Sequence, residues 1–130
     1  MGKTVLGELQ HAIMLILWRR GEATVNDVHR ELLRERGLAL TTVATMLRKM
    51  EQKGIVSRRT EGRQFVYRPT VTQGDVQRSM VRELVDRLFD GDPAALVTHL
   101  VEDHEIDADE LSQLAAELTK AEDQARRRDE

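Results

Sequence analysis

Three short helical patterns, followed directly by a strand–turn–strand pattern, constrain the fold of this chain more than any other feature. The first helix is predicted over residues 6–20, where apolar residues recur at helical spacing. The second helix is predicted to begin after Thr24, which has the spacing of a capping box with Asp27, and to end at Gly37. A short strand near Ala23 is expected to lead into this helix and could pair with the hairpin that follows.

The third helix has the clearest pattern of the three. Thr41 or Thr42 is predicted to cap it, and Gly54 to close it. Four apolar residues at positions i, i+3, i+4 and i+7 predict one buried stripe: Val43, Met46, Leu47 and Met50. Apart from Glu51, the outer face has only small, hydrogen-bonding or basic residues: Thr42, Ala44, Thr45, Arg48, Lys49, Gln52 and Lys53.

The next segment predicts a β-hairpin. Residues 55–59 and 64–69 are rich in β-formers and flank a turn that contains glycine. Phe65 and Tyr67 alternate with Val66 and are expected to be core residues rather than stacking platforms. Four arginines lie along the hairpin: Arg58, Arg59, Arg63 and Arg68. The order of three helices and a hairpin is that of a winged helix-turn-helix, so we predict a mainly α fold with a small β-hairpin and a first domain over residues 1–71.

Charge divides the chain into two unlike halves. Residues 1–74 contain 13 Lys and Arg against 7 Asp and Glu, whereas residues 75–130 contain 7 against 16, and the net charge of the whole is −3. A basic half joined to an acidic half is typical of a nucleic-acid module that carries a second module. Ordinary surface charge that drifts along the chain is the alternative.

The outer face of the third helix suits the major groove of DNA. Base edges in that groove are distinguished by polar and basic side chains, and a small residue allows close approach and contact with a thymine methyl. Four residues are predicted to read bases: Thr42, Ala44, Thr45 and Arg48. Six are predicted to contact phosphates: Thr41, Lys49, Lys53, Arg58, Arg59 and Arg63. The alternatives are a solvated helix face and arginines that keep an edge strand soluble.

Residues 72–130 are predicted to form a helical dimerisation domain. Thr72 and Asp75 match a second capping box, and Asp92 precedes a proline at the first position of another helix. Nine apolar residues form stripes that need a partner: Val76, Met80, Leu84, Leu88, Leu96, Leu100, Leu111, Leu114 and Leu118. A second copy of the chain would place two reading helices on one palindromic site. Packing on the wing domain, or a self-contained helical cap, are the alternatives.

Several classes of function are excluded or disfavoured. The absence of cysteine rules out disulfides, thiolate metal sites and cysteine nucleophiles. His99 and His104 lie five residues apart among acidic residues, which predicts a solvated surface rather than a metal site. We find no catalytic motif, so we expect neither an enzyme nor a cofactor. The longest apolar run, residues 12–18, is too short to span a membrane, and no export signal is visible, so a cytoplasmic protein without membrane insertion is expected.

Five stretches have joint spacing that points to a known family. They are Leu6-Gly-Glu-Leu, Ala23-Thr-Val-Asn-Asp-Val-His, Thr41-Thr-Val-Ala-Thr-Met-Leu-Arg-Lys-Met, Lys53-Gly-Ile-Val and Gly62-Arg-Gln-Phe-Val-Tyr-Arg-Pro. The pair Leu17-Trp18, followed by Gly21, belongs to the same pattern. Over about residues 4–120 the chain resembles the penicillinase-repressor family of bacterial transcription regulators, the BlaI, MecI and CopY group. The resemblance implies a homodimer that binds an inverted repeat of double-stranded operator DNA and blocks transcription. It places the reading helix on residues 41–53 and the wing on residues 58–68. The three dimerisation helices fall on residues 76–89, 93–102 and 108–121.

Release from DNA differs among members of this family. Antibiotic-resistance members are inactivated when a membrane metalloprotease sensor cuts an Asn-Phe bond, and the matching position here is His99-Leu100, where neither residue agrees. Cleavage by a sensor protease that prefers other residues is still an alternative. The C-terminal cysteine cluster of copper-responsive members is missing. The alternatives are a small-molecule-responsive regulator with a pocket between the wing domain and the dimer helices, and a winged-helix protein-interaction module without a DNA target.

Overall fold

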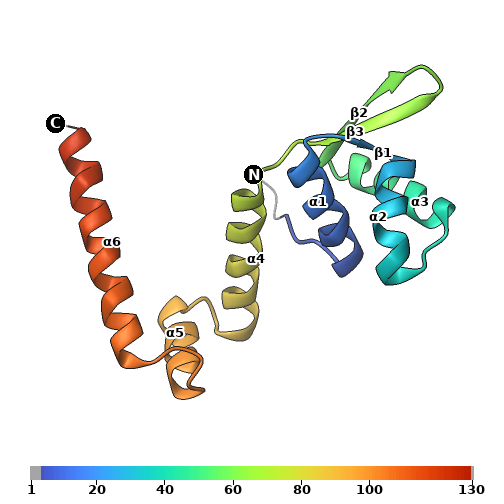
Figure 1. Ribbon diagram of the computed structural model, residues 1–130. Helices are drawn as coiled ribbons and strands as arrows, with labels where there is room; N and C mark the ends of the chain where they lie inside the picture. The colour runs from blue at the N-terminus through green and yellow to red at the C-terminus, as the bar shows by residue number, and fades with distance from the viewer. Residues whose placement is uncertain (1–3, 130) are drawn as a thin grey trace. The chain divides into compact units, whose positions relative to one another are not determined.

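The computed structural model describes residues 4–129, which divide between Glu83 and Leu84 into two compact units (Figure 1). The boundary falls within helix α4 (Gln73–Leu88), so this helix contributes residues to both units. The division into domains of residues 1–71 and 72–130 stays a prediction. Before α4, the first unit contains α1 (Glu8–Arg20), β1 (Ala23–Thr24), α2 (Val25–Arg36), α3 (Leu40–Gln52), β2 (Val56–Glu61) and β3 (Gln64–Pro69).

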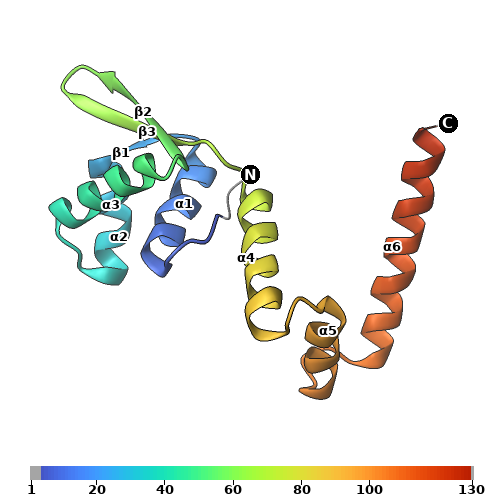
Figure 2. The same cartoon turned by 180° about the vertical axis from the view of Figure 1, so that it is seen from behind.

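The three strands form one antiparallel sheet in the order β1-β3-β2. Strand β1 pairs Ala23 with Tyr67 and continues for only one residue more, whereas β2 and β3 pair along their whole length up to Glu61 and Gln64. In both views the β2–β3 hairpin extends beyond the three helices (Figures 1 and 2). The winged helix-turn-helix architecture and the short strand near Ala23 are therefore confirmed.

The core of this unit lies between α1, α2 and α3 and is closed by the base of the sheet. The predicted stripe of α3 is buried, with Val43, Leu47 and Met50 fully enclosed and Met46 partly so. Burial of one such side chain contributes about 1.5–3 kcal/mol, so the stripe fixes which face of α3 is left outside. Each of these three helices contributes to the largest fully buried side chains: Ile13, Met14, Leu17, Val28, Val43, Leu47 and Met50.

The predicted ends of α2 are confirmed, including its C-terminal cap at Gly37, whereas the predicted start of α3 is not. The start of α2 is as predicted: the Thr24 hydroxyl accepts from the Asp27 amide, and the Asp27 carboxylate accepts from the Thr24 amide, both at 3.1 Å. The prediction that Thr41 or Thr42 caps α3 is wrong, because the helix begins one residue before Thr41. Its N-cap is Ala39, whose carbonyl oxygen accepts from the Thr42 amide at 3.1 Å.

Three aromatic side chains differ in how far they are buried. Trp18 is partly buried against it and donates its indole N–H to the carbonyl oxygen of Val71 at 2.9 Å, two residues before α4 begins. Tyr67 is buried as expected, but Phe65 is 43% exposed, so its assignment to the core is wrong. Phe65 lies beyond the two residues of β3 that pair with β1, so the packed base of the sheet does not cover it.

The second unit continues along the chain with α5 (Pro93–Glu102) and α6 (Ala108–Arg128). The helix expected over residues 108–121 runs about two turns further, because strong helix formers follow and three arginines lie in its last turn, where they complement the helix dipole. No residue of α5 or α6 in the described chain is buried. Leu118, for example, is 66% exposed.

Candidate nucleic-acid interface

The outer face of α3 carries the residues predicted to read bases. Thr42, Thr45 and Arg48 are exposed, and Ala44 is half-buried beside them. Thr42, Thr45 and Arg48 recur at a spacing of three residues, and Ala44 lies four residues before Arg48, so these side chains lie on the outer side of α3, away from the buried stripe. Within the described chain, Arg48 makes no hydrogen bond or ion pair through its side chain. Its guanidinium is therefore free to bind a ligand without breaking an internal contact.

The predicted phosphate contacts at the two ends of α3 have different surroundings. Thr41 is exposed in the first turn, and Lys49 is exposed in the last turn. Lys53, just after the helix, donates from its ammonium group to the carbonyl oxygen of Val5 at 3.2 Å and to Gln10 Oε1 at 3.1 Å. Lys53 therefore ties the end of α3 to the segment around the start of α1, and its charge is only partly available to DNA.

The tip of the hairpin is a two-residue loop of Gly62 and Arg63. Gly62 has φ of 63°, a left-handed conformation that glycine adopts without strain, and the first loop position is where two-residue hairpins of type II′ place it. Arg63 is exposed and makes no ion pair with any residue between 4 and 129. The tip therefore carries one unpaired positive charge away from the helices.

The two neighbouring arginines of β2 are paired with carboxylates. Arg58 Nε lies 3.1 Å from Glu51 Oε2, and the guanidinium carbon lies 4.2 Å from the ring centroid of Phe65. Arg59 binds Glu22 through both terminal nitrogens and Glu61 at 2.8 Å. Their role as phosphate contacts stays a prediction, and in the free protein both charges have partners.

The pairing of Arg59 also changes the acidity of its partner. The hydrogen bond from Arg59 holds the pKa of the Glu22 carboxyl below its ordinary value, against a smaller opposing effect of burial. Since Glu22 lies 37 residues before Arg59, no local pattern in the sequence announces this contact.

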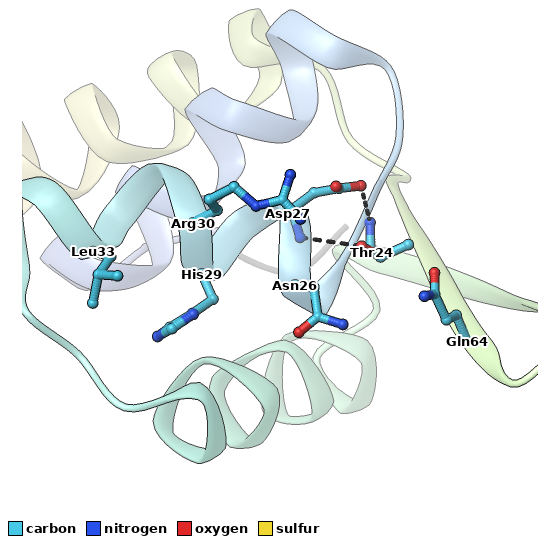
Figure 3. Close-up of a pocket in the computed structure, with 7 residues that line it drawn as sticks. All are labelled: Thr24, Asn26, Asp27, His29, Arg30, Leu33 and Gln64. Carbon is cyan, nitrogen blue, oxygen red and sulfur yellow. Dashed lines mark hydrogen bonds between the residues drawn. The ribbon is translucent and has the colours of Figure 1, made fainter.

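An open polar pocket lies at the start of α2, a feature that sequence reasoning did not find. Gln64 of β3 lies near Thr24 there, and the capping bonds between Thr24 and Asp27 are drawn in Figure 3. Its lining residues are Thr24, Asn26, Asp27, His29, Arg30, Leu33 and Gln64. The amide of Thr24 holds the pKa of Asp27 below its ordinary value, so this carboxylate is charged and already bonded. His29 Nε2 lies 2.8 Å from the carbonyl oxygen of Leu38 and fastens the turn between α2 and α3.

Among residues 4–129, no cluster of three or more His, Asp or Glu side chains could hold a metal ion. The helices in this part of the chain are all too short or too polar to cross a membrane.

The residues predicted for dimerisation fall into two groups. Val76 is 2% exposed and belongs to the core of the first unit, and Met80 packs partly against that core, so both are covered within their own chain. The other seven are exposed or half-buried: Leu84, Leu88, Leu96, Leu100, Leu111, Leu114 and Leu118. These seven therefore keep apolar surface that a partner could cover.

The predicted cleavage position lies inside helix α5. His99 is exposed with its ring 5.9 Å from that of Phe89, and Leu100 is half-buried. The carbonyl oxygen of Leu100 accepts from the amides of Glu105 at 3.0 Å and Ile106 at 3.3 Å. The bond between His99 and Leu100 is thus held in regular structure on both sides.

Three helices with a polar and basic outer face on the third, joined to an exposed hairpin, define a winged helix-turn-helix protein of the DNA-binding class. Residues 6–120 match the penicillinase repressor family, and the chain belongs to that family.

The comparison with individual relatives agrees with this assignment. The chain is 36% identical to the transcriptional regulator BlaI of Mycobacterium tuberculosis over 121 residues, covering 92% of this chain and 86% of the relative. It is 24% identical to the penicillinase repressor of Bacillus licheniformis over 109 residues, covering 84% and 85%. The solution structure of the DNA-binding domain of the repressor BlaI matches with a TM-score of 0.50 at 28% identity, covering 54% of this chain and 85% of that domain. These relatives are repressors and transcriptional regulators, not enzymes.

Proposed function

We propose that this protein is a homodimeric, cytoplasmic transcriptional repressor that reads an inverted-repeat operator with the outer face of α3. The observation that carries the proposal is the exposed row of Thr42, Thr45 and Arg48 beside the half-buried Ala44, held outward by a fully buried stripe. Hydroxyl, guanidinium and methyl groups are the ones that distinguish base edges in the major groove.

Phosphate contacts supply most of the affinity in this proposal. Thr41, Lys49 and Arg63 are exposed and available in the free protein. Each neutralised phosphate releases counterions, so the affinity falls steeply as salt rises. Occupation of a promoter then blocks transcription sterically.

The second unit joins two copies of the chain in this proposal. Exposed leucines such as Leu88 and Leu118 remain unburied in the single chain, and their burial against a second copy would be favourable. A two-fold symmetric dimer places two reading helices about one DNA turn apart, or slightly more.

Release follows from weakening this dimer, because binding at two linked half-sites is far tighter than at one. Proteolysis is one such signal, delivered by a membrane sensor protease. A cut between His99 and Leu100 would need α5 to open first, since the bond lies within a helix and Leu100 accepts two amides beyond it.

The first test is selection of bound duplexes from a random DNA pool at two salt concentrations. We expect one enriched inverted repeat at both concentrations and weaker binding at the higher one. Salt-sensitive binding without an enriched sequence would overturn the base-reading proposal, and absence of binding would favour a protein-interaction module.

A second test addresses the dimer with a matched pair of variants. Leu118→Glu adds a charge to the exposed apolar stripe of α6, whereas Gln113→Glu adds the same charge to an exposed polar position outside that stripe. We expect the first variant alone to sediment as a monomer and to lose the preference for a repeat over a single half-site. Equal behaviour of the two variants would contradict dimerisation through this stripe.

A further inference from the structure

The outer half of the hairpin has little support from the sheet. Strand β1 pairs only with Val66 and Tyr67, so the residues nearer the tip are paired with the neighbouring strand of the hairpin alone. Two-stranded hairpins are marginally stable in water by themselves. Side-chain contacts from outside the sheet are therefore needed to hold the tip in one position.

Two neighbouring arginines of β2 lie opposite Tyr67 and Val66, where the unsupported part of the hairpin begins, and bind carboxylates outside the sheet. They point to opposite faces because side chains alternate along a strand. On one face, Arg58 lies against Phe65 and binds Glu51, which is in the last turn of α3. On the other face, Arg59 binds Glu22, in the connection between α1 and β1. The hairpin is thus fastened on one side to the reading helix and on the other side to the α1–β1 connection.

We propose that Arg58 and Arg59 are positioning residues that brace the hairpin, rather than ligands of DNA phosphates, and that Arg63 is the phosphate contact of this element. The assignment to DNA rests on the proposed function. A contact between Arg58 and a DNA phosphate would separate Arg58 from both Glu51 and Phe65. The Glu51 carboxylate would then be unpaired close to the negatively charged DNA backbone. Arg63 has no partner to give up within the described chain.

The brace itself can be tested without DNA by amide hydrogen exchange over residues 58–65 of the full chain. We expect Glu51→Gln and Arg58→Gln each to speed exchange in this segment several-fold, and the double variant to exchange no faster than Arg58→Gln alone. Arg63→Gln is the matched control, since it removes a hairpin arginine without a partner, and should leave exchange unchanged. Equal exchange in Glu51→Gln and the parent protein would overturn the brace.

The role toward DNA is tested by the slope of log affinity against log salt. Each lost phosphate contact reduces that slope by about 0.9. For a dimer, Arg63→Gln should therefore reduce it by about 1.8, whereas Arg58→Gln should weaken binding without changing it. Glu51→Gln should weaken binding as well, because the wing loses its anchor.

Tighter binding by Glu51→Gln, together with a reduced slope in Arg58→Gln, would show that Arg58 is a phosphate ligand and would overturn the proposal. Failure of the proposed function is a different result, in which the parent protein selects no DNA sequence. In that case hydrogen exchange alone decides whether the brace exists.

Discussion

Replacement of Arg48 by Ala is the most direct test of base reading. The side chain is exposed on the outer face of α3 and has no ion pair or hydrogen bond in the described chain, so its removal breaks no contact within the fold. A bidentate contact between arginine and guanine contributes about 1–3 kcal/mol of discrimination. That range equals about a 5- to 150-fold loss at one half-site, and about 2–6 kcal/mol for a dimer on a symmetric operator.

The neighbouring Lys49 supplies the control. It is also exposed, and Lys49→Ala should lower affinity by a similar factor on every sequence and reduce the salt slope by about 0.9 per protomer. Arg48→Ala should instead relax the preference at one base position of each half-site. Neither residue is buried, so both variants should keep the melting temperature of the parent within a few degrees.

The assay is fluorescence anisotropy with a selected operator and a set of duplexes that each carry one base change per half-site. If Arg48→Ala binds every duplex more weakly by the same factor, then Arg48 contacts phosphate and its assignment as a base-reading residue is wrong.

Three further predictions concern stability. Leu47→Ala, at a fully buried position of α3, should lower the free energy of unfolding by about 2–5 kcal/mol in urea titrations, and a loss under 1 kcal/mol would contradict the packing. Thr24→Ala removes a side-chain cap and should cost about 1 kcal/mol, whereas Thr42→Ala, which caps nothing, should cost clearly less. The pKa values of Glu22 and Asp27 are lowered by folding, so their stabilisation is complete above the unfolded pKa values near 4 and is lost as pH falls through the folded ones. A free energy of unfolding that stays constant from pH 5 to pH 2 would contradict this.

The sequence predicts those parts of the fold that depend on patterns among neighbouring residues. The buried stripe of α3 and the capping box at Thr24 each need only a few consecutive residues, and both are confirmed. The turn that contains Gly62 is also confirmed, but the loop consists of Gly62 and Arg63 alone, because Thr60 and Glu61, expected in the turn, pair with β3.

The parts that were missed depend on contacts between distant segments. The pairing of Arg59 with Glu22 and of Arg58 with Glu51 arises only when the hairpin folds back, so an arginine count could not separate paired charges from free ones. The burial of Val76 is similar, since Val76 shares an apolar stripe with Leu84 and Leu88 of α4, while its own side chain belongs to the core of the first unit. The start of α3 at Leu40 was missed because no side chain caps it.

The bond between Trp18 and Val71 gives the protein a built-in optical probe. Trp18 is the single tryptophan of the chain, and its indole N–H is fixed to the backbone two residues before α4 begins. Indole emission depends on whether this group is bonded to protein or to water. Any event that pulls the start of α4 away from α1 would therefore change the emission of one known residue, without a label. Under the proposed function, operator binding or release that moves this junction would be followed in real time as a change in this emission.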